Sequence, residues 1–299
     1  MNYFIASLLV SALSAASAAQ ERPLIVASGT VSQDRENEFR LMPRYTNEKW
    51  IYSSTKAGNP LYSLYETQRT AAGWSAPIRF NPAPDFKAVN TLEAFFTDDG
   101  RYVFFVSDKD TTSSEDFDIW MAPTDNGKVG SPKKLPKLIN STSGEWFPSY
   151  QNGNLLFGSE RPGGLGRIDL YTAKFDGTTA SQLTAFPAPI NSRYEDFDPV
   201  MARDGSFLIF SSNRPSQYEG NRLFIVFRET NGTWSTLISL GKELAPHTDG
   251  SAASLSADQK TLYFTARATS PRRSGDLYSI DFQPILTKLR AEPKNSRND

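Results

Sequence analysis

One stretch of the chain decides its fold: Asp204-Gly205-Ser206-Phe207-Leu208-Ile209-Phe210-Ser211-Ser212. A turn-forming Asp-Gly pair precedes an apolar run of strand length that ends in hydroxyl side chains, as expected for the second strand of a β-hairpin. The same arrangement recurs four times, around Tyr52, Phe105, Phe157 and Phe264. Successive central aromatic residues, with Phe210 included, are 52 to 54 residues apart. This regularity is that of a repeat protein.

Each repeat contains four short segments of β type and no helical periodicity. A loop rich in Gly, Ser and Pro follows the central run and leads to another, such as Asp169-Leu170-Tyr171. Four strands in about 53 residues predict one blade of a β-propeller. Five blades leave no room for a sixth. The run 24–27 lies where a fourth strand would precede Tyr52, so we expect it to complete the last blade and close the ring.

The two ends of the chain differ in character from the repeats. Residues 1–18 combine an apolar run with the small residues Ala16-Ser17-Ala18, which predicts a cleaved secretory signal peptide, although the segment before the run contains no Lys or Arg. The propeller is expected over 20–287, and the polar segment 288–299 is expected to be disordered. No later segment is apolar enough to span a membrane, so we expect a periplasmic or extracellular protein.

The composition excludes several classes of function. The chain has 32 basic and 33 acidic side chains, no Cys and one His. A surface that binds nucleic acid needs an excess of Lys and Arg, so no nucleic-acid partner is expected. Without Cys there are no thiolate nucleophiles, disulfides or Cys-bound zinc, and a single His argues against Ser-His-Asp catalysis and multi-His metal sites. No catalytic residues are assigned from the sequence.

Basic and acidic residues recur together in three repeats. A basic residue lies shortly after the central run and an Asp opens the following one, as in Lys109 with Asp118, Arg161 with Asp169, and Arg267 with Asp276. The favoured interpretation is an ion pair within each blade that braces the loop between two strands. The alternative is a ring of cations for an acidic ligand. The first and fourth repeats have Pro60 and Arg222 in place of the Asp, so neither role extends around the whole ring.

Acidic residues also precede the first strand of each repeat, at Glu38, Glu93, Glu145, Glu195, Asp196 and Asp249. First strands line the channel of a propeller, so we predict that these carboxylates cluster at one channel mouth. There they would bind a hard cation such as calcium, bind a cationic ligand, or raise one another's pKa as in a catalytic pair. The plainer alternative is that each accepts backbone N–H bonds in its own loop. The identity of any metal stays open.

The repeats resemble the TolB-type, WD-like propeller repeats of bacterial envelope proteins. The resemblance is strongest over 157–164 followed by 169–171, and over 204–215, and it covers nearly all of the chain after the signal segment. It implies a propeller fold but not a single function, because such repeats occur in periplasmic scaffolds, beside peptidoglycan-binding domains and beside peptidases.

The function predicted from the sequence is that of a binding or scaffold module in the cell envelope, without catalysis of its own. Its partner would be an envelope protein or a carbohydrate ligand, and the expected state is a monomer. The alternative is a carbohydrate-active enzyme, a glycoside hydrolase or polysaccharide lyase, that uses the carboxylates at the channel mouth.

Overall fold

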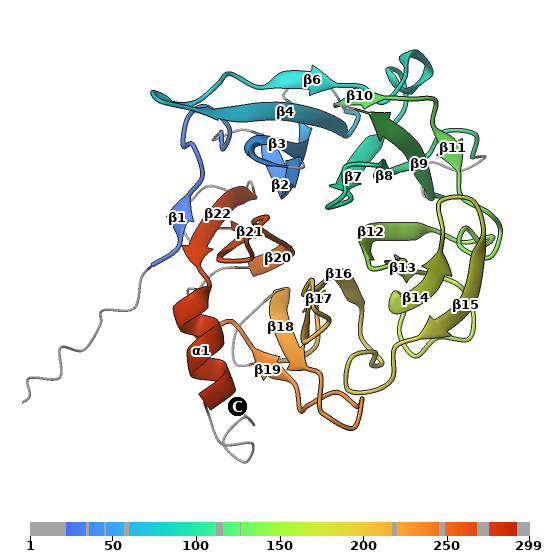
Figure 1. Ribbon diagram of the computed structural model, residues 1–299, viewed down its shortest axis with the longest axis vertical. Coiled ribbons are helices and arrows are strands. Elements are labelled where there is room, and N and C mark those ends of the chain that lie inside the picture. The colour runs from blue at the N-terminus through green and yellow to red at the C-terminus, as the bar shows by residue number, and fades with distance from the viewer. Residues whose placement is uncertain are drawn as a thin grey trace, which may run out of the picture.

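The chain forms a five-bladed β-propeller (Figure 1). The computed structural model describes residues 22–33, 36–44, 46–56, 60–111, 116–125, 127–216, 220–244, 249–267 and 275–291. The expected signal segment lies outside these residues. None of the described helices is long and apolar enough to cross a membrane.

Five antiparallel sheets make the blades, numbered here from the blade that contains Tyr52. The first contains β2 (Asn37–Arg44), β3 (Thr46–Thr55) and β4 (Ser63–Thr70), with the short β5 (Gly73–Trp74) and β6 (Ile78–Phe80) both paired to β4. The second contains β7 (Thr91–Phe96), β8 (Tyr102–Ser107) and β9 (Asp118–Asp125), with β10 (Lys128–Val129) and β11 (Lys133–Lys134) both paired to β9. The 3-10 turn η1 (Pro84–Phe86) lies between these two blades in the sequence.

The remaining three blades have four strands each. The third contains β12 (Glu145–Gln151), β13 (Asn154–Ser159), β14 (Asp169–Phe175) and β15 (Ala180–Ala185). The fourth contains β16 (Asp196–Met201), β17 (Phe207–Ser212), β18 (Arg222–Phe227) and β19 (Ile238–Ser239). The fifth contains β20 (Asp249–Leu255), β21 (Thr261–Arg267), β22 (Asp276–Asp281) and β1 (Leu24–Ile25).

The repeated aromatic runs are the second strands of the blades, as predicted. Their central residues Tyr52, Phe105, Phe157, Phe210 and Phe264 are all buried between neighbouring blades. The turn before each run reverses the chain from the first strand. In the third blade Asn152 and Gly153 make this turn with φ of 50° and 76°, a left-handed conformation that Gly and Asn adopt at the least cost.

The N-terminal strand closes the ring. β1 pairs antiparallel with β22, with Leu24 opposite Ser279 and Ile25 opposite Tyr278. The chain then turns inward, where Val26 and Val31 are buried in a cluster formed by the first and fifth blades. This seam between the first and last blades is the closure expected from the sequence, and it leaves the last blade with its outer strand supplied from the other end of the chain.

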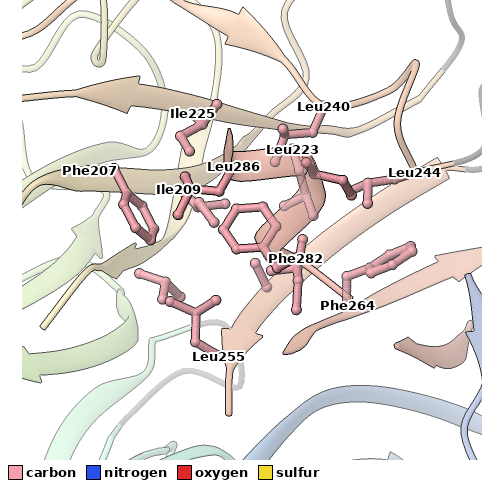
Figure 2. Packing of buried hydrophobic residues seen from close by; sticks show 14 of the residues in the cluster. Phe207, Ile209, Leu223, Ile225, Leu240, Leu244, Leu255, Phe264, Phe282 and Leu286 are labelled. Carbon is pink, nitrogen blue, oxygen red and sulfur yellow. The ribbon is translucent and has the colours of Figure 1, made fainter. Parts of the chain in front are cut away.

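A helix follows the last blade, where the sequence analysis expects none. α1 (Gln283–Ala291) extends into the segment expected to be disordered, and its Ile285, Leu286 and Leu289 are buried against the fourth and fifth blades. Figure 2 shows Leu286 packed among other residues of this cluster. Lys288 Nζ lies 2.8 Å from Glu243 Oε1. Within the segment 288–299, Lys288 and Arg290 lie on the exposed side of this short amphipathic helix. Residues 292–299 lie outside the described part.

Candidate functional site

Every innermost strand contains a β-bulge at the same place. The register of β2, β7, β12, β16 and β20 against the second strands shifts there, and one residue in each bulge has a positive φ between 53° and 59°. These residues are Arg40, Glu93, Phe147, Asp198 and Ala252. Because non-glycine residues rarely adopt this conformation, its recurrence in five blades indicates a shared device that aims one side chain per blade at the channel.

Hydroxyl side chains of the second strands hold three of the bulges. Thr265 Oγ1 accepts a hydrogen bond from Arg40 N at 3.2 Å, Ser53 Oγ accepts one from Glu93 N at 2.8 Å, and Ser211 Oγ accepts one from Ala252 N at 3.2 Å. Each bond runs from one blade to the next. The hydroxyl residues that end the repeated runs therefore join neighbouring blades at the channel wall.

Two charged side chains meet across the channel. Arg40 Nη1 lies 3.2 Å from Asp198 Oδ1, and Arg40 Nη2 donates to the carbonyl oxygen of Pro148 at 2.7 Å. Asp198 Oδ2 accepts hydrogen bonds from Ser211 Oγ at 3.1 Å and from Ala252 N at 2.9 Å. One guanidinium thus connects the first blade to the third and fourth.

Glu93 completes this axial cluster of Arg40, Glu93 and Asp198. Its Oε2 accepts a hydrogen bond from Phe147 N at 2.8 Å. Burial raises the pKa of Glu93 to about 8, Arg40 opposes that rise, and Asp198 adds to it. Burial also raises the pKa of Asp198, against the effect of Arg40. With a pKa of about 8, Glu93 keeps its proton at neutral pH, whereas the Arg40 guanidinium contacts Asp198 directly.

The axial cluster blocks the channel instead of lining an open cleft. Arg40, Glu93 and Asp198 are only 1%, 4% and 2% exposed. The three side chains are therefore surrounded by protein, and a substrate that arrives from solvent would not reach either carboxyl group in this arrangement.

A hollow lies on the propeller axis beyond the axial cluster, at the C-terminal ends of the innermost strands. Residues of all five blades line it: Met42, Pro43, Phe95, Phe96, Thr97, Asp98, Gln151, Val200, Met201, Arg203, Leu255, Ser256, Ala257 and Gln259. Apolar and polar side chains both contribute to the lining, and the apolar share is the larger. At the rim Arg203 Nε lies 2.7 Å from Asp98 Oδ2, which joins the hairpins of the second and fourth blades. Gln151 Nε2 and Asn152 Nδ2 both donate to the Arg203 carbonyl oxygen, so the third hairpin is tied to them.

The acidic residues predicted at the channel mouth do not occupy one position. Glu38, Glu145 and Asp196 are equivalent, because each lies opposite a Ser of the second strand. Glu93 lies two residues further on, at the bulge, and the second blade has Thr91 at the equivalent place. Glu195 and Asp249 each lie one residue before it. Within the described chain, no three Asp, Glu, His or Cys side chains gather as a group that could hold a metal ion.

The equivalent carboxylates of the third and fourth blades are bound within their own blades. Glu145 accepts hydrogen bonds from Ser141 N at 2.7 Å, Ser141 Oγ at 2.6 Å and Ser159 Oγ at 2.7 Å. Asp196 accepts hydrogen bonds from Ser192 N at 2.7 Å and Ser192 Oγ at 2.8 Å. These two acids organise loops, as the plainer alternative supposed.

The recurring basic residues bind these inner carboxylates. Arg161 Nη2 lies 3.4 Å from Glu145 Oε1, and Arg214 contacts Asp196 in the same way. Each guanidinium also lies over two rings of its own blade, Phe157 and Tyr171 for Arg161 and Phe210 and Phe224 for Arg214. Each donates to a loop carbonyl as well, Ile139 at 2.6 Å and Ile190 at 2.7 Å.

The ion pairs in the structure differ from those expected in the three repeats. Arg161 pairs with Glu145, whereas Asp169 accepts a hydrogen bond from Gly166 N at 3.0 Å. Lys109 lies 2.9 Å from Asp110 and 3.4 Å from Asp85, and Asp118 pairs with Lys134 at 2.5 Å. Arg267 lies 3.9 Å from Asp249, while Asp276 is buried. The side chains turn toward the innermost strand or the loops, where buried carboxylates and carbonyl groups need donors.

Three asparagines make a further connection that the charge pattern does not reveal. Asn140 Oδ1 accepts a hydrogen bond from Ile119 N at 2.9 Å and its Nδ2 donates to Ile119 O at 2.9 Å. Asn191 binds both backbone groups of Leu170 in the same way. Asn90 Oδ1 accepts a hydrogen bond from Tyr62 N at 2.9 Å. In the sequence these asparagines precede Glu93, Glu145 and Glu195 by three to five residues. That recurrence could have predicted a shared structural contact in three of the repeats.

Comparisons with known proteins reveal similarity at the level of fold. No protein-family model matches the chain, and no curated protein sequence matches it. An arabinanase from Bacillus subtilis aligns with a TM-score of 0.56 and 10% identity over 85% of this chain and 95% of its own. An exo-β-1,3-galactanase from Clostridium thermocellum aligns with a TM-score of 0.53 and 8% identity over 87% of this chain and 63% of its own.

A putative TolB from Agrobacterium tumefaciens aligns with a TM-score of 0.50 and 14% identity over 79% of this chain and 72% of its own. The likeness is one of fold. A prolyl endopeptidase aligns with a TM-score of 0.45 and 16% identity over 86% of this chain. The chain spans only 33% of the length of that protein. At these identities the alignments show the fold alone, and a fold does not by itself select a function.

Proposed function

We propose that this protein is a secreted or periplasmic propeller of the TolB type that binds a protein partner of the cell envelope and performs no catalysis of its own. The observation that carries the proposal is the axial hollow. Its lining comes from all five blades and combines apolar side chains with polar and charged ones. Apolar walls with a few polar groups are typical of binding sites. The secretory features of residues 1–18 support the location.

Site-specific photo-cross-linking tests the proposed binding site. A photoreactive residue at Gln259, in the hollow, is expected to give one discrete adduct with an envelope protein in intact cells. The same residue at the exposed Thr178, in the turn after β14, serves as the control. Adding Ala257→Trp, which fills the hollow from a partly exposed position, is expected to remove the adduct. An adduct that survives this substitution, or an equal adduct at Thr178, would contradict the proposal.

A second candidate function, glycoside hydrolysis, has one observation in its favour. The axial cluster combines a carboxyl group whose pKa is raised to about 8, Glu93, with a second carboxyl group, Asp198. Inverting and retaining glycosidases use such pairs. Burial of both groups argues against this function. Hydrolysis of arabinan or β-1,3-galactan that Glu93→Gln abolishes without loss of folding would establish the enzyme and displace the binding proposal.

A further inference from the structure

The seam between the first and fifth blades contains an unusual group of buried polar atoms. Glu38 Oε1, the Tyr52 hydroxyl, Ser54 Oγ and Ser63 Oγ are buried and have no hydrogen-bond partner among the described residues. All four side chains are 1% exposed or less. Buried polar groups are nearly always satisfied, by protein, water or an ion, so four such atoms together need an explanation. We call these four residues the seam cluster.

The register of the sheet places the four side chains on one face. Glu38 of β2 lies opposite Ser54 of β3, and Ser54 lies opposite Ser63 of β4. Directly opposed residues in an antiparallel sheet project to the same side, and Tyr52, two residues before Ser54, projects to that side too. Glu38 also raises the pKa of Tyr52, after the larger effect of burial, which places the carboxylate near the phenol.

The third and fourth blades show what occupies the same place there. Glu145 and Asp196 are equivalent to Glu38, and the guanidinium groups of Arg161 and Arg214 bind them over a pair of aromatic rings. The first blade has the ring pair as well, since Tyr52 stacks on Tyr65 with centroids 5.8 Å apart. The cation site is therefore built in all three blades.

The first blade supplies its own cation to a different acid. Lys56 stands at the position of Arg161 and Arg214, but its Nζ lies 3.6 Å from Glu36 Oε2 and 4.6 Å from the centre of the Tyr65 ring. Glu38 makes no ion pair with any described residue, and the backbone N–H of Gln33 reaches its Oε2 only at 3.5 Å. No described cation therefore takes the place at Glu38 that a guanidinium group takes at Glu145 and Asp196. Burial raises the pKa of Glu38 to about 8, so a cation that binds there must displace the proton of this carboxyl group.

We propose that the seam cluster binds a metal cation that prefers oxygen ligands, and that calcium is the ion best suited to it. The donors are a carboxylate and three hydroxyl groups, all hard oxygen ligands. A mixed set of one carboxyl group and three hydroxyl groups suits the flexible coordination of calcium better than the strict octahedron of magnesium. A site with so few negative charges belongs in the weak range of extracellular calcium modules, with a Kd of roughly 0.1 to 1 mM.

Binding at this position would stabilise the closed ring. Glu38 N donates to the carbonyl oxygen of Gly275 at 3.1 Å, so the cluster adjoins the fifth blade. An ion bound there would be held by the first blade at its contact with the fifth blade, where β1 and β22 close the ring. The proposal is independent of the axial hollow and of what binds in it.

Terbium luminescence and thermal unfolding of the full chain test the site. Terbium, a substitute for calcium, is expected to give emission sensitised by Tyr52 and Tyr65 that calcium competes away. About 10 mM calcium is expected to raise Tm by about 3 to 10 °C relative to chelator. Glu38→Gln is expected to lose both responses. Glu145→Gln is the matched control, because Arg161 already binds that carboxylate, and it should keep both.

The outcomes separate the proposal from its alternatives. A Tm that does not respond to calcium, or responds equally in the Glu38→Gln variant, would overturn the site. If Glu38→Gln does not fold, Ser54→Ala provides the same comparison, with an expected weakening of calcium competition by about tenfold. An unchanged competition curve in Ser54→Ala would likewise count against the proposal. Magnesium that matches calcium in competition would remove the assignment to calcium.

Discussion

Arg40 and Asp198 lie in blades that are not neighbours, yet their side chains are 3.2 Å apart and almost completely buried. The pair crosses the channel, as the half-exposed pair of Arg203 with Asp98 does at the rim of the hollow, whereas the hydrogen bonds at the bulges join neighbouring blades. Burying two charges costs free energy, and the cost is recovered only if every partner stays in place. The axial cluster is therefore a point where one substitution has consequences in several blades.

Replacing Arg40 tests this point. Arg40→Ala leaves Asp198 without its cation in the interior, so we expect the free energy of unfolding to fall by about 3 to 5 kcal/mol. Arg203→Ala is the control, because its pair with Asp98 is half-exposed and should contribute less than about 1 kcal/mol. Urea denaturation measures both. Equal losses in the two variants would show that burial of the axial pair has no special weight.

The protonation of Glu93 predicts how stability changes with pH. The unfolded chain releases the Glu93 proton above the ordinary pKa of 4.5, whereas the folded chain retains it up to about 8. Between these values the native state binds more protons, so stability falls as pH rises, by about 1.4 kcal/mol per pH unit from this group.

Glu93→Gln removes that titration. We therefore expect its free energy of unfolding to change less between pH 5 and pH 8 than that of the unaltered protein. Urea midpoints measured across this range decide the matter. Parallel pH profiles for the two proteins would mean that Glu93 is ionised in the folded state.

The guanidinium clamp of the third blade predicts a larger effect than a surface ion pair. Arg161→Ala removes the partner of buried Glu145, several hydrogen bonds and the ring contacts, and we expect a loss of about 2 to 4 kcal/mol. Arg167, which is 63% exposed and pairs with Glu160 and Glu195, is the control, with an expected loss below about 1 kcal/mol for Arg167→Ala. Thermal melts that rank the two variants the other way would contradict this view.

Ring closure predicts different sensitivities along one short segment. Val31 is fully buried in the seam, whereas Leu24 of β1 is 70% exposed. Val31→Asp places a carboxyl group in that apolar cluster, and we expect a loss of about 3 kcal/mol or more. Leu24→Asp should change stability by less than about 0.5 kcal/mol. Differential scanning calorimetry distinguishes the two, and a mild effect of Val31→Asp would imply that the segment does not hold the ring closed.

The repeat pattern predicted the blades well because burial between blades imposes the same aromatic residue at the same place. The partners of individual side chains were harder to predict from the sequence. Ser159 lies opposite Glu145 on one side and Asp169 on the other, so spacing along the chain could not show which acid Arg161 reaches. The choice depends on a carboxylate in the interior that needs a donor.

The axial cluster was hidden for a different reason. Arg40, Glu93, Phe147, Asp198 and Ala252 share a backbone conformation but no chemistry, so no residue type marks the position. Only Glu93 and Asp198 are acidic among them, and the sequence analysis included just the first. The helix α1 was missed because its apolar residues span little more than two turns at the end of the chain.

The pairing of β1 with β22 also constrains the order of assembly. Leu24 meets Ser279, so nearly the whole chain must be synthesised before the last sheet acquires its outer strand. Contacts between residues so distant in sequence carry a large loop-closure entropy and slow folding. Until that contact forms, β22 presents an unpaired edge to other chains. The newly made protein is therefore most vulnerable to aggregation immediately before completion, and a chain cut short before β22 would leave the edges of β21 and β1 without their partner strand.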